Sequence, residues 1–387
     1  MKKLPVVPVF FAFMLFLIQS CSSDPTDPSG RIIISTTPGN IETIAGLGPL
    51  NFDYTGDGGL ATSAKLGWIT AITLSSSGDV YITDGSANTV REINASTGKI
   101  STIAGTFIGF NEIDPTPFAG DGGLATLSHL NIPLSIGVDG SNNIVILDAG
   151  NNVVRQITSS DSKISSIIGT RMQGYTGDGG LAISATLFNP YSIAIDPSDN
   201  IYIAESGNHV VRMITKSTGK ITTIAGLGPD HAGYTGDSDA ATEAELNGPS
   251  GIAVDADGDI YISDTGNNVV RKISGGIITT IAGTGALGYS GDGGDATSAT
   301  FNSLKGIAVD HLGNVYVADS GNNAIRKIDT TTGEISTLAG TGAVGYSGDG
   351  GLASSAKLSG PLGVAVDADG NIFIADTGNN AIRVVTK

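Results

Sequence analysis

Short hydrophobic segments, separated by turns rich in glycine and asparagine, fill most of the chain after residue 40. Apolar and polar residues alternate in many of these segments, and β-branched residues are frequent, which is typical of strands. Residues 249–283 hold four such segments, at 250–255, 260–264, 269–273 and 277–283. The short turns between them predict four antiparallel strands joined by hairpins.

This unit occurs six times. The arginine of its third strand recurs at intervals of 55 to 64 residues, at Arg91, Arg155, Arg212, Arg271, Arg326 and Arg383. A repeat of this length indicates an architecture in which each unit buries its hydrophobic face against its neighbours. Four-stranded units repeated around an axis are the blades of a propeller. The sequence therefore predicts an all-β fold, a six-bladed β-propeller of four-stranded antiparallel blades.

The two ends of the repeat region predict how the ring closes. Each of the five complete fourth strands ends in two apolar residues and a glycine, most often Ile-Ala-Gly. The same Ile-Ala-Gly occurs at 44–46, before any complete unit, and the chain ends on a third strand at 381–386. We expect strand 41–46 to pair with the C-terminal strands and complete the last blade, because closure leaves no free sheet edge. The propeller would then cover residues 41–387. Residues 31–35 also resemble the third strand of a blade. They would compete with 381–386 for the third-strand position in the last blade.

The N-terminus has the pattern of a secretory signal. Two lysines precede an apolar stretch at 4–18, which is shorter than the roughly 20 residues that a membrane span needs. The next residues, Ile18-Gln19-Ser20-Cys21, resemble a bacterial lipobox, although Gln19 is not the usual small residue. We expect residues 1–20 to be a signal peptide and Cys21 to carry the lipid.

Residues 22–30 are polar and cannot pack a core, so we expect residues 21–40 to be a lipid-anchored tether. The expected protein is a lipoprotein of a bacterial cell envelope, anchored to the outer membrane and either periplasmic or surface-exposed. A plain cleavage site followed by a chance cysteine is the alternative.

Charge and cysteine content exclude several classes of function. The chain has 20 basic and 37 acidic residues, for a formal charge of −17. Such a surface repels phosphate backbones and anionic lipid, so we expect no nucleic-acid partner. Cys21 is the single cysteine, which rules out an intramolecular disulfide and a cysteine-based metal cluster. We expect a monomer.

Several recurring pieces resemble the NHL repeat family. They are Asn-His-Val at 208–210, the Asp-x-Gly-Asn-Asn turn, the Gly-Ile-Ala-Val-Asp strand and the connection Tyr-x-Gly-Asp-Gly-Gly-x-Ala. The connection is similar to the longer loops of bacterial surface proteins and teneurin-like NHL domains. The resemblance covers residues 41–387 and implies a six-bladed propeller. It does not imply one activity, because NHL-like propellers include protein-binding, RNA-binding, sensor and lyase members.

Two sets of repeated acids are predicted to share one face, which we call the top face. It carries the connections between blades and the turns between second and third strands. The loop acids are Asp57, Asp121, Asp178, Asp237, Asp292 and Asp349, and the strand acids are Asp84, Asp148, Glu205, Asp264, Asp319 and Asp376. They could attract cations. Alternatively, each loop acid caps the helical turn after it (60–66 in the first copy), and each strand acid pairs with the arginine of its blade. Six-fold repetition favours this scaffold role.

Residues found in single copies are better candidates for a site. His129, His209 and His231 fall on top-face loops of neighbouring blades, near several carboxylates. Histidine and carboxylate together could hold zinc or a similar divalent metal, and some NHL-like lyases use a propeller-centred metal. No cofactor is otherwise expected.

A second candidate set lies where the first strand of each blade begins, at the mouth of the central channel. The equivalent positions are Thr70, Leu134, Tyr191, Ser250, Lys305 and Leu362, with Trp68 close by. Such varied residues suit ligand or partner recognition, and drift at exposed positions is the alternative. The connection 106–121 is the longest and carries Phe107, Phe110 and Phe118, which predicts a contact loop or a packing cluster.

The function predicted from these features is a binding or recognition module that meets a protein, peptide or glycan on its top face. A metal-dependent lyase or lactonase using the three histidines is the alternative. A structural spacer is a third possibility.

Overall fold

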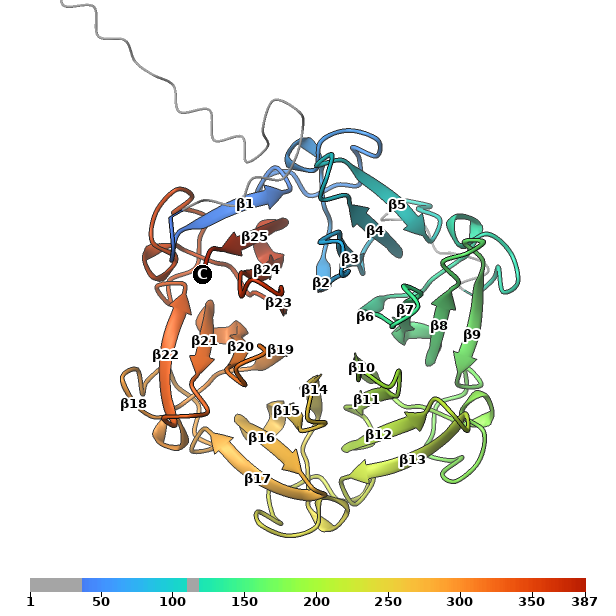
Figure 1. The fold of residues 1–387 in the computed structure, drawn as a ribbon, viewed down its shortest axis with the longest axis vertical. Coiled ribbons are helices and arrows are strands. Elements are labelled where there is room, and N and C mark those ends of the chain that lie inside the picture. Colours follow the sequence, from blue (N-terminus) through green and yellow to red (C-terminus); the bar gives the residue numbers. More distant parts are fainter. Residues whose placement is uncertain (1–36, 110–117) are drawn as a thin grey trace, which may run out of the picture.

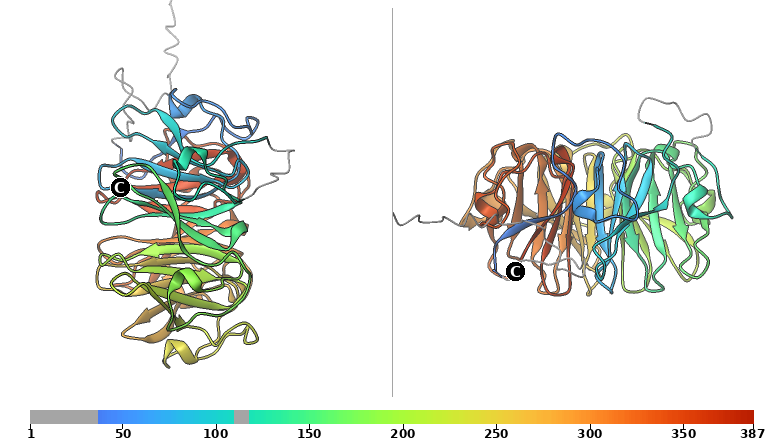
Figure 2. Two further views of the ribbon diagram at one scale, coloured as in Figure 1. Left: turned by 90° about the vertical axis from the view of Figure 1, so that its right-hand side faces the viewer. Right: turned by 90° about the horizontal axis from the view of Figure 1, so that it is seen from above.

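The computed structural model describes residues 37–109 and 118–387, which form six antiparallel sheets around a central channel (Figure 1). Two further views show the sheets standing side by side in a flat, disc-like ring (Figure 2). The predicted six-bladed propeller is thereby confirmed. The signal peptide, Cys21, most of the tether, segment 31–35 and Phe110 lie outside the described residues.

Each blade runs from a first strand at the channel to a fourth at the rim. Blade 1 has β2 (Ile69–Leu74), β3 (Val80–Asp84), β4 (Thr89–Ile93) and β5 (Ile100–Ala104). Blade 2 has β6 (Pro133–Val138), β7 (Ile144–Asp148), β8 (Val153–Ile157) and β9 (Ile164–Ile168). Blade 3 has β10 (Pro190–Ile195), β11 (Ile201–Glu205), β12 (Val210–Thr215) and β13 (Lys220–Ala225).

The second half of the ring repeats this order. Blade 4 has β14 (Pro249–Val254), β15 (Ile260–Asp264), β16 (Val269–Ser274) and β17 (Ile277–Ala282). Blade 5 has β19 (Leu304–Val309), β20 (Val315–Asp319), β21 (Ala324–Ile328) and β22 (Glu334–Ala339), with β18 (Gly294–Asp295) added beside β22. Blade 6 has β23 (Gly363–Val366), β24 (Ile372–Asp376), β25 (Ala381–Val385) and β1 (Ile41–Ala45).

The ring closes as the sequence predicts. N-terminal β1 pairs with C-terminal β25, with Ile41 opposite Val385 and Thr43 opposite Arg383. Gly46 follows β1 with φ of +91°, and a Cβ at this position would lie 2.2 Å from the backbone oxygen of Asn380. Only glycine fits this close approach without strain, which explains the Ile-Ala-Gly ending of the fourth strands.

The hydrophobic core consists of layers between neighbouring blades. Tyr202 of blade 3, for example, belongs to one buried cluster with Ile252, Ile260 and Ile273 of blade 4. Burial of each such side chain stabilises the fold by about 1.5–3 kcal/mol. Each blade therefore depends on the next one for its core, as the repeat length suggests.

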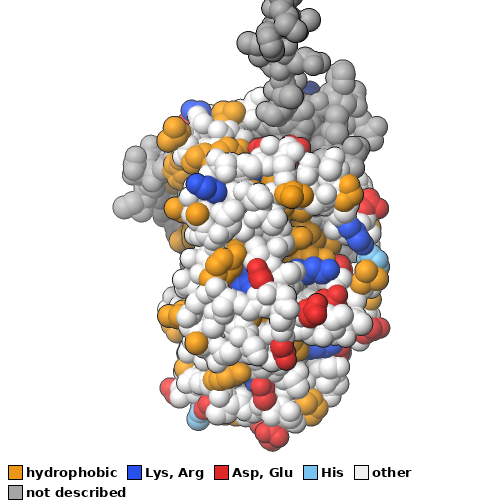
Figure 3. Space-filling model, turned by 90° about the vertical axis from the view of Figure 1, so that its left-hand side faces the viewer, with side chains coloured by type: hydrophobic (Ala, Val, Ile, Leu, Met, Phe, Trp, Pro, Cys, Tyr) orange, Lys and Arg blue, Asp and Glu red, His pale blue; other side chains and the backbone are white. Residues whose placement is uncertain are grey.

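The helices of the described residues are all three-residue 3-10 turns, and none is long and apolar enough to span a membrane. They are η1 (Ala61–Ser63), η2 (Ala125–Leu127), η3 (Ala149–Asn151), η4 (Ala182–Ser184), η5 (Ala241–Glu243), η6 (Thr265–Asn267), η7 (Ala296–Ser298), η8 (Ser320–Asn322), η9 (Ala353–Ser355) and η10 (Thr377–Asn379). On the side of the molecule seen in Figure 3, acidic, basic and hydrophobic side chains are interspersed.

Candidate ligand-binding site

The repeated arginines hold the scaffold together. Arg212 of β12 is fully buried, and its Nη2 donates to Asp178 Oδ1 at 2.6 Å while Nη1 donates to Glu205 Oε1 at 3.3 Å. Nη1 also donates to the backbone oxygen of Thr186, and the ring of Tyr175 lies 5.4 Å from the guanidinium carbon. The Arg212 side chain thus links the connection that precedes blade 3 to strands β11 and β12 of that blade.

The capping role predicted for the loop acids is wrong. Asp57 accepts hydrogen bonds from Arg91 Nε and Nη2 and from the backbone N–H of Thr102. The helical turn that follows begins after Leu60, which makes no side-chain cap within the described residues. The acid prefers a buried guanidinium because a charged hydrogen bond is stronger than a cap on a single turn.

The predicted pairing of strand acids with arginines is observed in five blades. The distances are 3.7 Å for Arg155 and Asp148, 3.3 Å for Arg212 and Glu205, 3.5 Å for Arg271 and Asp264, 3.3 Å for Arg326 and Asp319, and 3.8 Å for Arg383 and Asp376. Burial raises the pKa of Asp148 to about 7 and those of Asp264 and Asp376 to about 6. Buried and paired in this way, these acids are not open to solution cations.

His209 has a structural role in its turn. It takes the left-handed conformation (φ 56°) that asparagine takes at the equivalent Asn323 and Asn88. Its Nδ1 accepts from the backbone N–H of Gly248 at 3.0 Å, as Asn323 Oδ1 does from Gly360 and Asn88 Oδ1 from Ile132. Burial lowers the pKa of His209, which keeps this nitrogen an acceptor.

The metal site predicted from His129, His209 and His231 finds no support. Within residues 37–109 and 118–387, no group of three or more His, Cys, Asp or Glu side chains is placed to hold a metal ion. His129 lies in a bridge to Ala119 at the rim of blade 2, and the N–H of His231 donates to Gly228 in the connection into blade 4. The three residues belong to separate local structures.

The aromatic residues of the longest connection form packing contacts where they are described. Phe118 stacks on Arg155 at 4.8 Å, the place that Tyr175 has on Arg212. The Phe107 ring centroid lies 4.5 Å from that of Tyr54. Both contacts favour a packing cluster over a contact loop.

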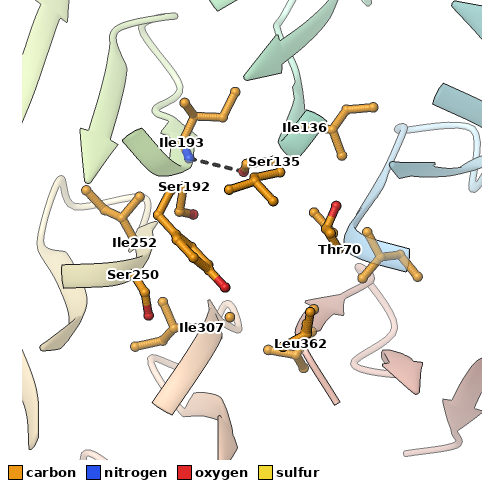
Figure 4. A pocket seen from close by; sticks show the side chains of 16 residues that line it. Thr70, Ser135, Ile136, Ser192, Ile193, Ser250, Ile252, Ile307 and Leu362 are labelled. Carbon is orange, nitrogen blue, oxygen red and sulfur yellow. Dashed lines mark hydrogen bonds between the residues drawn. The ribbon is translucent and has the colours of Figure 1, made fainter. Parts of the chain in front are cut away.

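The variable positions of the first strands do converge at the channel mouth (Figure 4). A cavity of about 80 Å³ is lined by Thr70, Leu134, Tyr191, Ser250 and Leu362, five of the six. Below them lie inward residues of the same strands, among them Ser135, whose Oγ accepts from the N–H of Ile193. Trp68 is 39% exposed and does not line this cavity.

Lys305, the sixth variable position, does not line the cavity but contacts one of its lining residues, Tyr191. Its Nζ lies 4.8 Å from the centroid of the Tyr191 ring, close enough for a cation–π contact. Burial lowers the pKa of Lys305 and raises that of Tyr191. Thr70 and Ser250 are only 7% and 3% exposed, so drift at exposed positions does not describe these two residues.

Hydroxyl groups bridge neighbouring blades around the mouth. In four blades the residue after the strand acid donates to a backbone oxygen at or just before the first strand of the next blade. Thr377 Oγ1 donates to the oxygen of Ile69 at 2.7 Å, and Ser206 Oγ to that of Pro249 at 2.6 Å. Thr265 and Ser320 make the same bond to Leu304 and Pro361. Blade 1 has glycine at this position, and Thr70 Oγ1 reaches Pro133 instead, at 2.8 Å.

The junction between blades 2 and 3 departs from this pattern. Blade 2 has Ala149 at the bridging position, so that residue has no hydroxyl to offer Pro190. A groove of about 390 Å³ opens here, lined by Ile132, Leu134, Ala149, Gly150, Asn189, Pro190, Tyr191 and Ser206. It shares Leu134 and Tyr191 with the channel-mouth cavity. The two hollows therefore adjoin at these two side chains, and together they form the candidate site, which we call the mouth site.

Comparison with known proteins assigns the family. The model of the Teneurin NHL domain matches residues 34–274, 226–290 and 285–345, and that of the NHL repeat matches 358–385. The chain belongs to the teneurin NHL family.

Curated relatives of this teneurin NHL chain are much longer proteins. Protein SUPPRESSOR OF QUENCHING 1, chloroplastic, of Arabidopsis thaliana is 26% identical over 267 residues, which is 66% of this chain and 25% of that protein. Teneurin-1 of Mus musculus is 31% identical over 238 residues, which is 56% of this chain and 8% of that protein. This chain thus spans a quarter or less of the length of either relative.

Solved structures share the propeller fold. One is a structural genomics protein of unknown function from Bacteroides thetaiotaomicron, with 20% identity, a TM-score of 0.64, and coverage of 89% of this chain and 75% of that one. Another is an auxiliary nutrient binding protein from Bacteroides ovatus, with 14% identity, a TM-score of 0.62 and the same coverage.

Two residues of the mouth site were missed by sequence reasoning in this NHL chain. Ile132 is 43% exposed and adopts φ of +49°. The equivalent positions of three other blades hold Asn189, Gly248 and Ser303, which also have positive φ. A β-branched residue in this conformation costs roughly 1–2 kcal/mol. The signal was present, because Ile132 stands where four other copies have a small or polar residue, and Ala149 lacks the hydroxyl group that four other copies carry.

Proposed function

We propose that this propeller is a binding module whose ligand docks at the mouth site, between blades 2 and 3 of the top face. One observation carries the proposal: the first-strand positions that differ most among the six copies meet there, in hollows that share Leu134 and Tyr191. Repeated positions maintain the ring, so residues that depart from the repeat are free to serve a ligand.

The lining favours a ligand with an apolar anchor. Ile132, Leu134 and Pro190 form apolar walls, and Asn189 and Tyr191 also line the groove. Mostly apolar hollows with a few polar groups are typical of recognition sites. A protein or peptide segment with a hydrophobic side chain fits this chemistry, as does the apolar face of a glycan.

The cellular setting belongs to the same proposal. We propose attachment to the outer membrane through lipid on Cys21, as the lipobox-like residues predict. One solved protein of the same fold is described as an auxiliary nutrient binding protein. That description is compatible with a ligand-binding role at the cell envelope. Labelling cells with an alkyne fatty acid tests the anchor: the chain should be labelled and the Cys21→Ser variant should not, and equal labelling of both would contradict it.

Binding at the mouth site can be tested with libraries of candidate ligands. The full chain carrying Cys21→Ser, purified without detergent, is screened against a phage-displayed peptide library and a glycan array. Hits are then measured with Leu134→Asp and Tyr191→Ala. We expect at least tenfold weaker binding with either variant.

The matched control is Leu287→Asp. Leu287 is 70% exposed on the connection into blade 5 and takes no part in the mouth site. Binding to this variant should change less than twofold. Hits that bind Leu134→Asp and Tyr191→Ala as well as the parent chain would overturn the proposal.

A further inference from the structure

One buried aromatic position is missing from blade 2. The second residue of the second strand is aromatic in the other five blades: Tyr81, Tyr202, Tyr261, Tyr316 and Phe373. Each of these rings packs against the following blade, as Tyr202 does against Ile260 and Ile273. Blade 2 has Val145 instead, packed with Ile201 and Ile214 of blade 3.

Three of the tyrosines also make the same hydrogen bond. The hydroxyl donates to the aspartate of its own turn between first and second strands, at 3.0 Å in each case, from Tyr202 to Asp196, Tyr261 to Asp255 and Tyr316 to Asp310. The fold therefore repeats a site that accommodates a phenol ring, which we call the phenol receptor. The next blade supplies its apolar walls, and a polar group lies at its far end.

In blade 2 this receptor is partly empty. A cavity of about 200 Å³ lies between blades 2 and 3, with Val145, Ile168, Ile201 and Ile214 in its apolar lining. Ile168 replaces an alanine found in the other five fourth strands, so it takes up part of the vacated space. The cavity volume exceeds the roughly 150 Å³ of an engineered apolar cavity that binds benzene, and here Asp139, Asp199 and Lys216 make part of the lining polar.

The polar end of the cavity has a substitute for the missing hydroxyl. Gln156 Nε2 donates to Asp139 Oδ2 at 2.9 Å, the bond that tyrosine makes to the equivalent Asp196. Asp139 also accepts from the N–H groups of Ser141 and Asn143 and from Asn143 Nδ2. Its four acceptor positions are therefore filled. A molecule in the cavity would meet the Gln156 carboxamide, with Lys216 nearby as a further donor.

We propose that this cavity binds a small free phenol. The ring lies against Val145, Ile201 and Ile214, and the hydroxyl bonds to the carboxamide of Gln156. A phenol fits because four blades place a tyrosine ring in the corresponding space, and because its hydroxyl can both donate and accept. This site opens toward the turns between third and fourth strands, on the face opposite the mouth site, and does not depend on the proposed function.

The probe is p-cresol, which has the ring and hydroxyl of a tyrosine side chain. Titrated calorimetrically into the full chain carrying Cys21→Ser, it should bind with one equivalent and raise the Tm, and toluene should bind at least fivefold more weakly. Val145→Tyr fills the cavity from within, so it should weaken p-cresol binding at least tenfold. No saturable binding to the parent chain, or unchanged binding to folded Val145→Tyr, would overturn the proposal.

Two further variants keep the test decisive if Val145→Tyr does not fold. Gln156→Leu leaves the apolar walls intact, so the preference for p-cresol over toluene should disappear; a retained preference contradicts the assigned role of Gln156. Tyr202→Val creates a matching cavity against blade 4, and we expect two equivalents of p-cresol in place of one. A stoichiometry that stays at one would contradict the phenol-receptor argument.

Discussion

Lys305 of blade 5 places its Nζ 4.8 Å from the centroid of the Tyr191 ring of blade 3, across the channel mouth. The ammonium gains a cation–π contact but loses hydration, and burial accordingly lowers its pKa. Holding the positive charge in this partly buried place costs free energy. A ligand that displaces Lys305 would let the ammonium regain water.

The first prediction concerns the pH dependence that Lys305 creates. Its pKa is lower in the folded state, so between that value and the ordinary value of about 10.4 the unfolded chain binds more protons. The cost of burying the charge is present at neutral pH and disappears as pH rises through this window. The free energy of unfolding of the parent chain should therefore increase relative to Lys305→Met between pH 7 and 10, as measured by urea denaturation. The control is Lys99→Met, which removes an exposed lysine; an equal trend for the two variants would contradict the prediction.

The second prediction tests the arginines as scaffold. Arg212→Met leaves the carboxylates of Asp178 and Glu205 without their buried partner, which should cost at least about 3 kcal/mol of stability. The control is Lys272→Met, which breaks the partly exposed pair with Asp259 and should cost less than about 1 kcal/mol. Calorimetric unfolding measures both. Similar losses for the two variants would contradict the scaffold role.

The third prediction restores the missing bridge between blades 2 and 3. In Ala149→Ser the new hydroxyl can donate to the oxygen of Pro190, as Ser206 does to Pro249. We expect a gain of about 0.5–1.5 kcal/mol in unfolding free energy. The reciprocal variant, Thr377→Val, removes the bridge to Ile69 and should lose about 1 kcal/mol or more. A destabilised Ala149→Ser would mean that the groove cannot accept the bridge.

The fourth prediction follows from the buried Asp148, whose pKa burial raises to about 7. Between about pH 4 and 7 the folded chain holds this proton while the unfolded chain releases it, so the contribution of Asp148 to stability decreases as pH rises. Relative to Asp148→Asn, the parent chain should lose up to about 4 kcal/mol over this range. Urea denaturation at pH 4.5 and 7 measures the difference.

The control for this measurement has the opposite sign. The backbone N–H of Lys163 lowers the pKa of the exposed Asp161, so the contribution of that group is present at neutral pH and lost in acid. Asp161→Asn should therefore show a small trend in the other direction. A parent chain that gains stability relative to Asp148→Asn between pH 4.5 and 7 would contradict the prediction.

The repeat made the ring predictable, including its closure. Ile44-Ala45-Gly46 has the sequence of a fourth strand, so its partner had to be the unpaired C-terminal third strand, and β1 does pair with β25. The channel-mouth residues were predictable for the same reason, because equivalent positions on a ring lie at equal height. Because the six copies are related by the symmetry of the ring, aligning their sequences predicts which residues lie at the same level of the propeller.

Predictions based on local chemistry were less successful. Asp57 was expected to cap a neighbouring turn, but its partner Arg91 is 34 residues away, and a rule about adjacent residues cannot find it. His209 resembled a metal ligand, although the turn needs an acceptor in a left-handed conformation there and a histidine can supply one. The groove was missed because one of its lining residues, Ala149, differs from most other copies only by the absence of a hydroxyl group.

The pairing of β1 with β25 has a consequence for the order of events during synthesis. The first blade-forming strand to emerge from the ribosome must wait for the last one, almost the entire chain later, before it has a partner. Until then blade 6 is incomplete and its neighbours each lack one wall of their core. The ring can therefore close only after β25 has been synthesised, so the propeller stays open until this strand is available.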